Sequence, residues 1–323
     1  VILLATYNGQ DFLHEQLRSL RNQTDVNWVL VVRDDHSTDA TPEVIDAFAR
    51  SCPPGQVVRI PSGEKRLGAV ENFVTLLREA PLGARYAFCD QDDIWFPDKL
   101  ARASRLLGCH DPNIPALYCA RQTVVSRDLR EIGLSPAAPR RPSLRNALVQ
   151  NIAVGCTVVM NETARQAFLA VPPPPESFHD WWCYLVTTAT GGRVVFDTSP
   201  VMHYRQHGSN VVGMQPDLRA RVLNAAARGP AIFMQRVVAQ AEELLKHPNL
   251  TSDARALLQN ISSLRTASLI DKMKSCRRAG IYRQSRLEDA ALYAWIVSWH
   301  FHLAFSKKGS VSTGPAHGKG ERA

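Results

Sequence analysis

The fold is indicated first by the run Tyr86-Ala87-Phe88-Cys89-Asp90-Gln91-Asp92-Asp93. Here an apolar, β-rich segment ends in three carboxylates within four positions. In an open α/β sheet, ligands bind at the carboxyl ends of the strands, so acids at this point face the expected crevice. Carboxylates this close repel one another unless a cation lies among them, and hard oxygen ligands suit Mg²⁺ or Mn²⁺, which bridge carboxylates to substrate phosphates. The alternative is an acidic turn that caps a helix starting at Pro97.

Two more polar segments follow apolar runs and extend the same rim. Arg33-Asp34-Asp35-His36-Ser37-Thr38-Asp39 comes after Trp28–Val32, and Thr6-Tyr7-Asn8-Gly9 comes after Val1–Leu4. A carboxylate at a strand end can accept hydrogen bonds from a base N–H or from ribose hydroxyls, although an Asx-rich turn would have the same composition. We therefore expect a nucleotide site lined by Thr6, Tyr7, Asn8, Asp35 and Asp90.

The order of elements predicts an α/β sheet followed by helices. Up to about residue 110, β-rich runs alternate with segments of helical period, which is typical of a mostly parallel sheet with helices on its faces. The expected strands are Val1–Leu4, Trp28–Val32, Val57–Ile60, Tyr86–Cys89, Gly155–Met160 and Arg193–Phe196. The expected helices are Phe12–Leu20, Pro42–Arg50, Ala69–Glu79 and Pro97–Leu107, and residues 218–305 also have a helical pattern. Residues 306–323, rich in Gly, Ser and Lys, are expected to be disordered.

The composition is that of a globular protein with one large domain or two smaller ones. The seven cysteines are odd in number and never spaced as CxxC, which argues against a disulfide framework and a zinc cluster and favours a reducing, cytoplasmic setting. No charged leader precedes the first apolar run, so no secretory signal is visible. The net charge of +8 is uneven, because residues 1–213 hold 21 Lys and Arg against 22 Asp and Glu, whereas residues 214–323 hold 17 against 8.

These motifs, in this order, resemble those of the family 2 glycosyltransferases of the GT-A fold. The resemblance covers about two thirds of the chain and is carried by Leu3–Asn8, Gln23-Thr24, Asp34–Thr41 and Asp90–Leu100. The motifs His179-Asp180-Trp181-Trp182 and Tyr204–Asn210 are similar to those of the bacterial rhamnosyltransferases of O-antigen and capsule assembly. Ala5 stands where the family often has Pro, and His36 where it usually has Gly, but neither departure removes a carboxylate.

The resemblance implies a GT-A catalytic domain over residues 1–213, a helical C-terminal region over 214–305 and a tail over 306–323. Asp35 would hold the donor base, with Tyr7 and Asn8 nearby. Asp90 and Asp92 would form the DxD element, with Asp92 as the direct ligand of Mg²⁺ or Mn²⁺ and Asp93 orienting it. The metal would neutralise the charge that develops on the leaving nucleoside diphosphate.

An inverting transferase needs a carboxylate that takes the proton from the acceptor hydroxyl, and in the resemblance Asp180 occupies that place. Trp181 and Trp182 are expected to give the acceptor sugar a flat apolar face. The alternative is that Asp180 caps a helix and that both tryptophans belong to the core. Farther along, Arg205 and His207 are expected to form a lid over the donor diphosphate, where His207 can also complete the shell of the metal.

The segment Ala290–Phe305 is strongly apolar and aromatic, yet shorter than the ~20 residues that span a bilayer. It follows six basic residues, Lys272, Lys274, Arg277, Arg278, Arg283 and Arg286. A basic stretch beside an aromatic helix predicts a peripheral contact with the cytoplasmic face of the membrane. A helix packed on the catalytic domain is the equal alternative.

Together these features predict an inverting, metal-dependent transferase of bacterial surface polysaccharide synthesis. The expected donor is a nucleotide diphosphate sugar such as dTDP-rhamnose, and the expected acceptor is a saccharide, which can be lipid-linked. A nucleotidyltransferase acting on a sugar phosphate would share the crevice and the acidic metal site but would consume a nucleoside triphosphate. A basic nucleic-acid-binding protein is suggested only by the charge, and because the bases lie on helical segments away from the acidic crevice we expect no nucleic acid partner.

Overall fold

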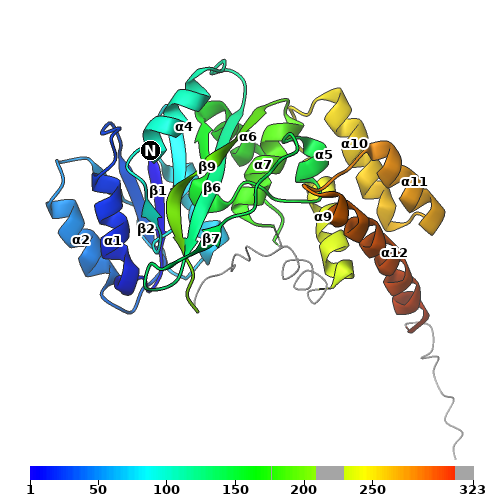
Figure 1. Ribbon diagram of the computed structural model, residues 1–323, viewed down its shortest axis with the longest axis horizontal. Helices are drawn as coiled ribbons and strands as arrows, with labels where there is room; N and C mark the ends of the chain where they lie inside the picture. The colour runs from blue at the N-terminus through cyan, green and yellow to red at the C-terminus, as the bar shows by residue number, and fades with distance from the viewer. Residues whose placement is uncertain (176, 209–228, 310–323) are drawn as a thin grey trace, which may run out of the picture.

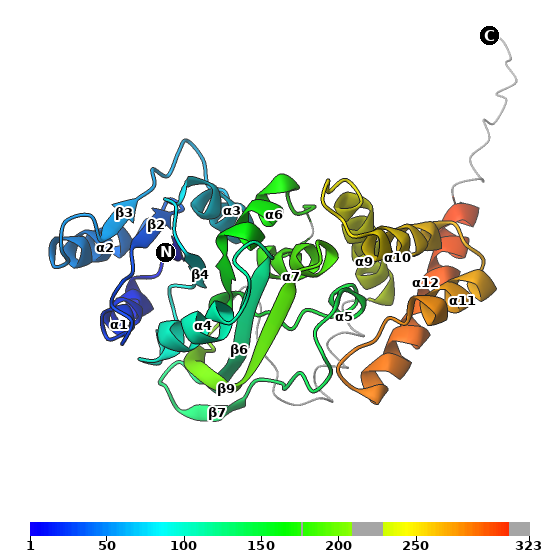
Figure 2. The same ribbon diagram turned by 90° about the horizontal axis from the view of Figure 1, so that it is seen from above.

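The computed structural model describes the backbone of residues 1–175, 177–208 and 229–309, and side chains as far as Phe301. A mixed sheet with helices on its faces makes up the larger body, and the C-terminal helices pack at one end of it (Figures 1 and 2). The strands are β1 (Ile2–Thr6), β2 (Leu30–Asp34), β3 (Val57–Arg59), β4 (Arg85–Cys89), β5 (Ile94–Trp95), β6 (Ala116–Val125), β7 (Glu131–Leu134), β8 (Val159–Asn161) and β9 (Arg193–Arg205). The helices of the sheet body are α1 (Gln10–Arg21), α2 (Thr41–Arg50), α3 (Ala69–Glu79), α4 (Lys99–Gly108), α5 (Leu144–Ala147), α6 (Glu162–Ala170) and α7 (His179–Ala189).

The predicted parallel half of the sheet is confirmed. Strands β3, β2, β1 and β4 lie side by side in that order and run parallel. Thr6 pairs with Asp34, and Leu4 pairs with Cys89, so the three strands β1, β2 and β4 end at the same edge. The carboxyl ends therefore converge as the sequence predicts, because parallel strands in register must end together.

The second half of the sheet is mixed, and one of its expected strands differs in the structure. Strand β8 runs antiparallel to β4, β6 pairs with both β8 and β9, and the two residues of β5 pair with the end of β9. The expected strand Gly155–Met160 begins instead as a 3₁₀ turn, η1 (Gly155–Thr157), and only Val159–Asn161 forms a strand. The Thr157 hydroxyl donates to Val154 O at 2.7 Å, and such a local side-chain bond competes with strand pairing.

The C-terminal region is helical, with α9 (Pro230–Leu244), α10 (Ser252–Ser262), the 3₁₀ turn η2 (Ser263–Arg265), α11 (Leu269–Ala279) and α12 (Arg286–Gly309). Helix α12 packs against α9 and α11, and it buries Leu292, Trp295, Ile296 and Trp299. These four apolar side chains are therefore used in packing, as the alternative interpretation predicts, and a membrane contact of this region stays a prediction. Within the described ranges, no helix is long and apolar enough to cross a membrane.

Two predicted boundaries lie at the limits of the described chain. Helix α12 continues through Gly309, four residues beyond the expected end at 305. The expected domain boundary at residue 213 and the expected tail from 310 to 323 lie outside the described residues.

Candidate active site

The loops that follow β1 and β4 are joined by the side chain of Gln91. Its Oε1 accepts from the Tyr7 amide at 2.9 Å, and its Nε2 donates to Tyr7 O at 2.9 Å. A Cβ on Gly9 would lie 2.2 Å from Gln91 Oε1, so only glycine permits this close approach. Gln91 lies inside the acidic motif, but we predicted no role for it from the sequence. In the structure it fixes the spacing of the two rim loops.

The Thr6 side chain is buried and does not line an open site. Its hydroxyl donates to Asp34 Oδ1 at 2.8 Å, and Asp34 also accepts from the amide and hydroxyl of Ser37. The Thr6 hydroxyl therefore links the end of β1 to the end of β2. This corrects the expectation that Thr6 contacts a nucleotide. Asn8 is exposed at the rim, where its Oδ1 accepts from the Thr38 amide at 2.8 Å.

Asp35 organises a loop of the rim. Only 2% of it is exposed, and its carboxylate accepts from Arg33, from the Leu67 amide at 2.8 Å and from the Gly68 amide at 2.7 Å. Burial acts to raise the pKa of this carboxyl, but these hydrogen bonds outweigh it and hold the pKa below its usual value. The loop presents the guanidinium of Arg66, 3.5 Å above the centre of the Tyr7 ring. A contact of Asp35 with a donor base stays a prediction.

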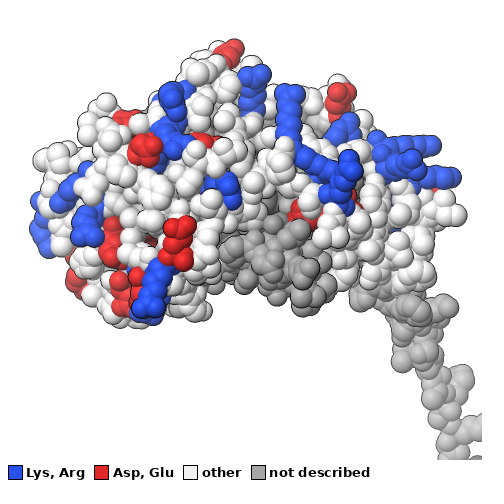
Figure 3. All heavy atoms as spheres, viewed as in Figure 1, with Lys and Arg blue, Asp and Glu red and all other residues white. Residues whose placement is uncertain are grey.

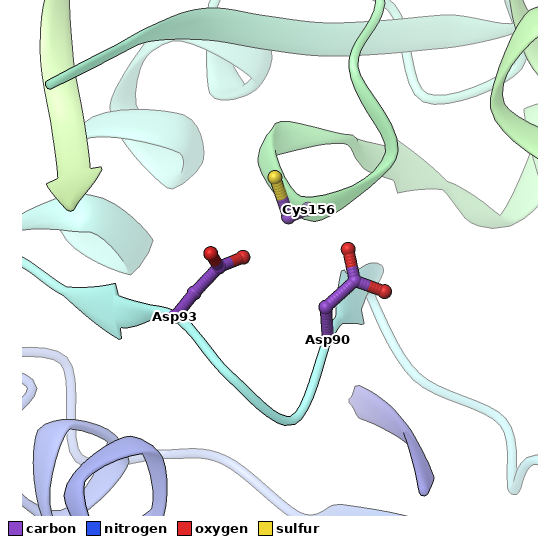
Figure 4. Close-up of side chains that lie close together, drawn as sticks. All are labelled: Asp90, Asp93 and Cys156. Carbon is purple, nitrogen blue, oxygen red and sulfur yellow. The ribbon is translucent and has the colours of Figure 1, made fainter. Parts of the chain in front are cut away.

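Two acids of the motif converge on a cysteine from another element (Figure 4). Ligand atoms of Asp90 at the end of β4, Asp93 before β5 and Cys156 in η1 all lie within 4.8 Å of one another. The pKa of Asp90 is raised to about 7, first by burial and then by the charges of Asp92 and Asp180. Asp93 is 1% exposed, and its Oδ2 has no hydrogen-bond partner among the described residues. A cluster of acids with raised proton affinity therefore lies behind the rim.

A buried lysine lies beside this cluster of acids. Lys99 is fully buried, its Nζ donates to Cys156 O at 2.5 Å, and the same Nζ lies 3.2 Å from the centre of the Trp95 ring. Burial lowers the pKa of Lys99 to about 8, against the opposing effect of Asp93 and Asp90. The sequence prediction missed Lys99 and Cys156, because neither has a spacing that marks it.

The predicted meeting of the lid segment with the acidic motif is seen for His207. Because Ile94 pairs with His203, the end of β9 runs beside the motif, and His207 Nε2 lies 2.7 Å from Asp92 Oδ2. Stacking on Phe12, with 4.5 Å between the ring centres, holds the imidazole in place. His207 and Asp92 therefore form one half-buried pair at the mouth of the crevice.

Arg205 does not occupy the predicted lid position. Its side chain is 5% exposed, forms an ion pair with Glu15 and donates to Arg127 O at 3.0 Å. The guanidinium thus anchors the end of β9 to α1, and the prediction that it contacts the donor diphosphate is wrong for this conformation. Its backbone amide serves the site indirectly, by donating to Asp93 Oδ1 at 3.3 Å.

Asp180 lies in the first turn of α7, and the helix cap is Phe178. Its Oδ2 accepts from the Gly155 amide at 2.9 Å, and its Oδ1 accepts from the Trp181 amide at 2.6 Å. Burial raises the pKa of Asp180 to about 6, although these hydrogen bonds oppose the shift. The carboxylate also lines a cavity of about 600 Å³. Asp180 thus combines a raised proton affinity with access to a ligand-sized space.

The two tryptophans after Asp180 have different surroundings. Trp181 is 6% exposed and lines the cavity, while its Nε1 donates to Ala147 O at 2.6 Å. Trp182 is fully buried, and its Nε1 donates to Val171 O at 2.9 Å. The predicted acceptor contact of Trp182 is therefore wrong, because successive helix residues point in different directions and this one faces the core.

A family model described as Glycosyl transferase family 2 matches residues 1–162. The chain belongs to this family. The matched segment contains the three rim loops and the acidic motif, and it ends before Asp180. Membership favours glycosyl transfer over the nucleotidyl transfer and nucleic-acid binding that the sequence left open.

Among relatives, the glycosyltransferase is 29% identical over 233 residues to the dTDP-rhamnosyl transferase RfbG of Shigella flexneri, across 68% of this chain and 76% of that protein. Among solved structures, it is similar to S. aureus TarS 1–349 in complex with UDP-GlcNAc, with a TM-score of 0.59 and 16% identity over 95% of this chain and 91% of that one. It is also similar to the mannosyltransferase PcManGT from Pyrobaculum calidifontis in complex with GDP-Man and Mn²⁺, with a TM-score of 0.53 and 17% identity over 95% and 87% of the two chains. These likenesses confirm the predicted GT-A fold.

Proposed function

We propose that this glycosyltransferase moves a sugar, with inversion, from a nucleoside diphosphate to a hydroxyl of a saccharide, and that dTDP-rhamnose is the donor. The observation that carries the proposal is the position of Asp180, a half-buried acid that lines the cavity of about 600 Å³ and whose charge also acts on Asp90. The donor sugar is inferred from RfbG, a dTDP-rhamnosyl transferase by name, to which the chain is 29% identical.

The donor would lie along the rim at the ends of β1, β2 and β4. Tyr7 and Arg66 already form a stacked pair there, and a planar base can pack on such a surface. Asn8 is exposed at the edge of this surface, and Asp35 accepts from the two backbone amides that follow Arg66 in the chain. We propose that these four residues hold the nucleoside.

The carboxylates of the motif fit Mg²⁺ or Mn²⁺, because they are hard oxygen donors and the imidazole of His207 lies 2.7 Å from the Asp92 carboxylate. We propose that Asp92, Asp90 and His207 would hold the ion. Burial and the neighbouring acids raise the pKa of the Cys156 thiol, which makes it a poor ligand for such a metal. When bound, the metal supplies positive charge that stabilises the leaving diphosphate. PcManGT, which shares the fold, holds Mn²⁺ in its solved structure.

In the proposed reaction, Asp180 accepts the proton of the acceptor hydroxyl. The hydroxyl oxygen bonds to the anomeric carbon as the bond from that carbon to the nucleoside diphosphate breaks, so the product carries the inverted configuration. The base must be ionised, so with a pKa raised to about 6 the activity should fall as the pH drops below that value.

The test is a screen of dTDP-rhamnose, UDP-glucose and GDP-mannose with purified protein, with and without Mn²⁺. We expect metal-dependent release of dTDP from dTDP-rhamnose, and an inverted anomeric configuration in any transfer product by NMR. Release of pyrophosphate from dTTP and a sugar phosphate would instead support nucleotidyl transfer. A product of retained configuration would overturn the mechanism.

We also propose that an anionic membrane binds the exposed face of α11. Figure 3 shows Lys and Arg side chains grouped over this end of the molecule. Three basic residues, Lys274, Arg277 and Arg278, are exposed, and the two arginines lie three and four residues after Lys274 along the helix. The exposed Ile270, one turn before Lys274, can insert into the membrane surface. This surface would place the enzyme beside a lipid-linked acceptor.

Changing Lys274, Arg277 and Arg278 to Glu should abolish co-sedimentation with phosphatidylglycerol vesicles, because each basic residue near such a surface contributes on the order of 1 kcal/mol. Added salt should weaken the binding of the unchanged protein. The matched control changes three exposed arginines of the sheet body to Glu and should retain binding to the vesicles. These are Arg18, Arg50 and Arg78. Equal loss in both variants would point to net charge rather than to this face.

A further inference from the structure

A second cavity, of about 450 Å³, lies at the edge of the sheet opposite the acidic motif. Its lining includes Arg193, the first residue of β9, whereas His207 beside the motif follows the other end of that strand. Strands β4, β6 and β9 run in the same direction, because β8 is antiparallel to both β4 and β6, and β6 is parallel to β9. A strand of 13 residues is about 40 Å long, so this cavity is separate from the candidate active site.

The titratable residues that line this cavity are all basic. They are Arg141, Arg193 and His110, and no Asp or Glu lines the cavity among the described residues. Neither arginine forms an ion pair within the part of the chain that the structure describes, whereas the neighbouring Arg140 is paired with Asp289 at 2.6 Å. A concave surface lined by charge of one sign attracts the opposite ion, so this basic pocket favours an anion.

The two arginines of the basic pocket are anchored through their backbone and accessible through their side chains. The Tyr282 hydroxyl donates to Arg141 O and lies 2.8 Å from Ser143 Oγ, which ties this segment to the turn before α12. Arg193 begins β9, and its Nη1 donates to His110 Nδ1 at 3.2 Å. Both arginines are exposed, so a ligand from solvent can reach their guanidinium groups.

The composition of the basic pocket fits a phosphate ester. A guanidinium group binds phosphate through two parallel N–H bonds, and two such groups can share the outer oxygens of one phosphate. Apolar side chains complete the lining beside these donors and suit the carbon skeleton of an ester. They are Pro142, Leu144, Val194 and Val195. The volume also lies in the range of small-molecule sites, roughly 300–1,000 Å³.

We propose that the basic pocket binds the phosphate group of a small phosphate ester, through Arg141 and Arg193. The inference goes beyond the proposed function and does not depend on it, because the pocket lies at the far edge of the sheet. Either a soluble ester or a lipid headgroup would supply this phosphate. Arg145 follows Leu144 of the lining and donates to Ala279 O at the end of α11, so basic residues continue from the pocket to α11. Figure 3 shows Lys and Arg side chains along this side of the molecule.

The test labels the arginines of the full chain with phenylglyoxal and identifies the modified residues by mass spectrometry. Glycerol 3-phosphate at about ten times its dissociation constant should slow the labelling of Arg141 and Arg193 roughly tenfold, by mass action. Arg50 is the matched control, because it is an exposed arginine of α2 outside the pocket, and its labelling should not change. All samples have the same ionic strength, so that screening of charge is equal.

A second arm replaces the soluble ester with phosphatidylglycerol vesicles. Protection by the ester alone supports the pocket with a soluble ligand, and protection by the vesicles supports it with a lipid headgroup. In the vesicle arm, the double variant Arg141→Gln, Arg193→Gln should co-sediment less than Arg18→Gln, Arg50→Gln, which removes the same charge from the sheet body.

Calorimetric titration of single variants tests the two arginines directly. Arg141→Gln and Arg193→Gln should each weaken the binding of glycerol 3-phosphate at least roughly tenfold, because a hydrogen bond to a charged group is lost. Arg50→Gln should bind the ester normally, and binding of dTDP with Mn²⁺ should be unchanged in all three. A failure of the unaltered protein to bind dTDP would count against the proposed function alone. Normal ester binding by both pocket variants, or no protection of Arg141 and Arg193 by ester or vesicles, would overturn the inference.

Discussion

Replacing Asp180 with Asn should leave donor affinity unchanged and lower turnover by at least roughly 10²-fold, the lower limit for a lost general base. The amide keeps the size of the carboxylate and one acceptor oxygen for the Gly155 amide, which donates to Oδ2 at 2.9 Å in the native protein. It loses the ability to take a proton, and it also loses the second oxygen, which accepts from the Trp181 amide at 2.6 Å. The measurement is kcat for sugar transfer beside the Kd of dTDP-rhamnose in the presence of Mn²⁺.

The competing explanation is that Asp180 only joins α7 to η1. That role predicts a lower melting temperature and a parallel loss of donor binding. Asp197→Asn is the matched control, because Asp197 is a largely buried acid that accepts from Arg102 and from the Tyr118 hydroxyl at 2.9 Å, away from the cavity. It should destabilise the protein without slowing turnover. Near-normal turnover of Asp180→Asn would return Asp180 to a structural role.

The pH profile adds an independent check on the same residue. Since burial raises the pKa of Asp180 to about 6, the turnover of the native enzyme should fall as the pH drops through this value, where the base becomes protonated. The residual activity of Asp180→Asn should lack this acid limb. A limb that persists in the variant would belong to another group.

The rim of the site could be predicted because it depends on strand order alone. Asp34 is the last residue of β2 and Asp90 follows β4 directly, and parallel strands in register must end at one edge. Apolar runs that end in acidic residues are local features of the sequence, so the sequence alone is sufficient to predict that these groups lie together. His207 and Asp92 were expected to lie together as ligands of one metal, but their direct contact was not predicted, and its cause, the pairing of the two-residue β5 with the end of β9, was not visible in so short a strand.

The errors concern side-chain direction and long-range packing. Trp182 and Arg205 stand in motifs that indicate function. In the structure Trp182 faces the core and Arg205 forms an ion pair with Glu15, and the neighbouring residues in the sequence do not indicate either side-chain direction. The wall of the active-site cavity could not be predicted, because Phe233 and Trp295, which line it, meet only when α9 and α12 fold together. Contacts between segments so far apart leave no local pattern.

Replacing Asp92 with Asn should abolish the metal-dependent part of donor binding. Its carboxylate is 15% exposed, touches His207 at 2.7 Å and adds to the charge that raises the pKa of Asp90. Loss of outer groups around a metal already costs about 10–100-fold in affinity, so loss of a direct anionic ligand should cost at least roughly 10²-fold. Calorimetric titration of dTDP with and without Mn²⁺ measures the effect.

The same substitution should not harm the fold, and this separates a metal ligand from a structural acid. Removing one of several crowded negative charges relieves repulsion, so in the absence of metal the melting temperature of Asp92→Asn should equal or exceed that of the native protein. Mn²⁺ should raise the melting temperature of the native chain and leave that of the variant unchanged. The control is Asp98→Asn, six residues along the chain at an exposed ion pair with Arg102, which should respond to Mn²⁺ as the native protein does. If Asp92→Asn still shows a full Mn²⁺ response in both assays, the ion is held elsewhere and the assignment of the acidic motif is wrong.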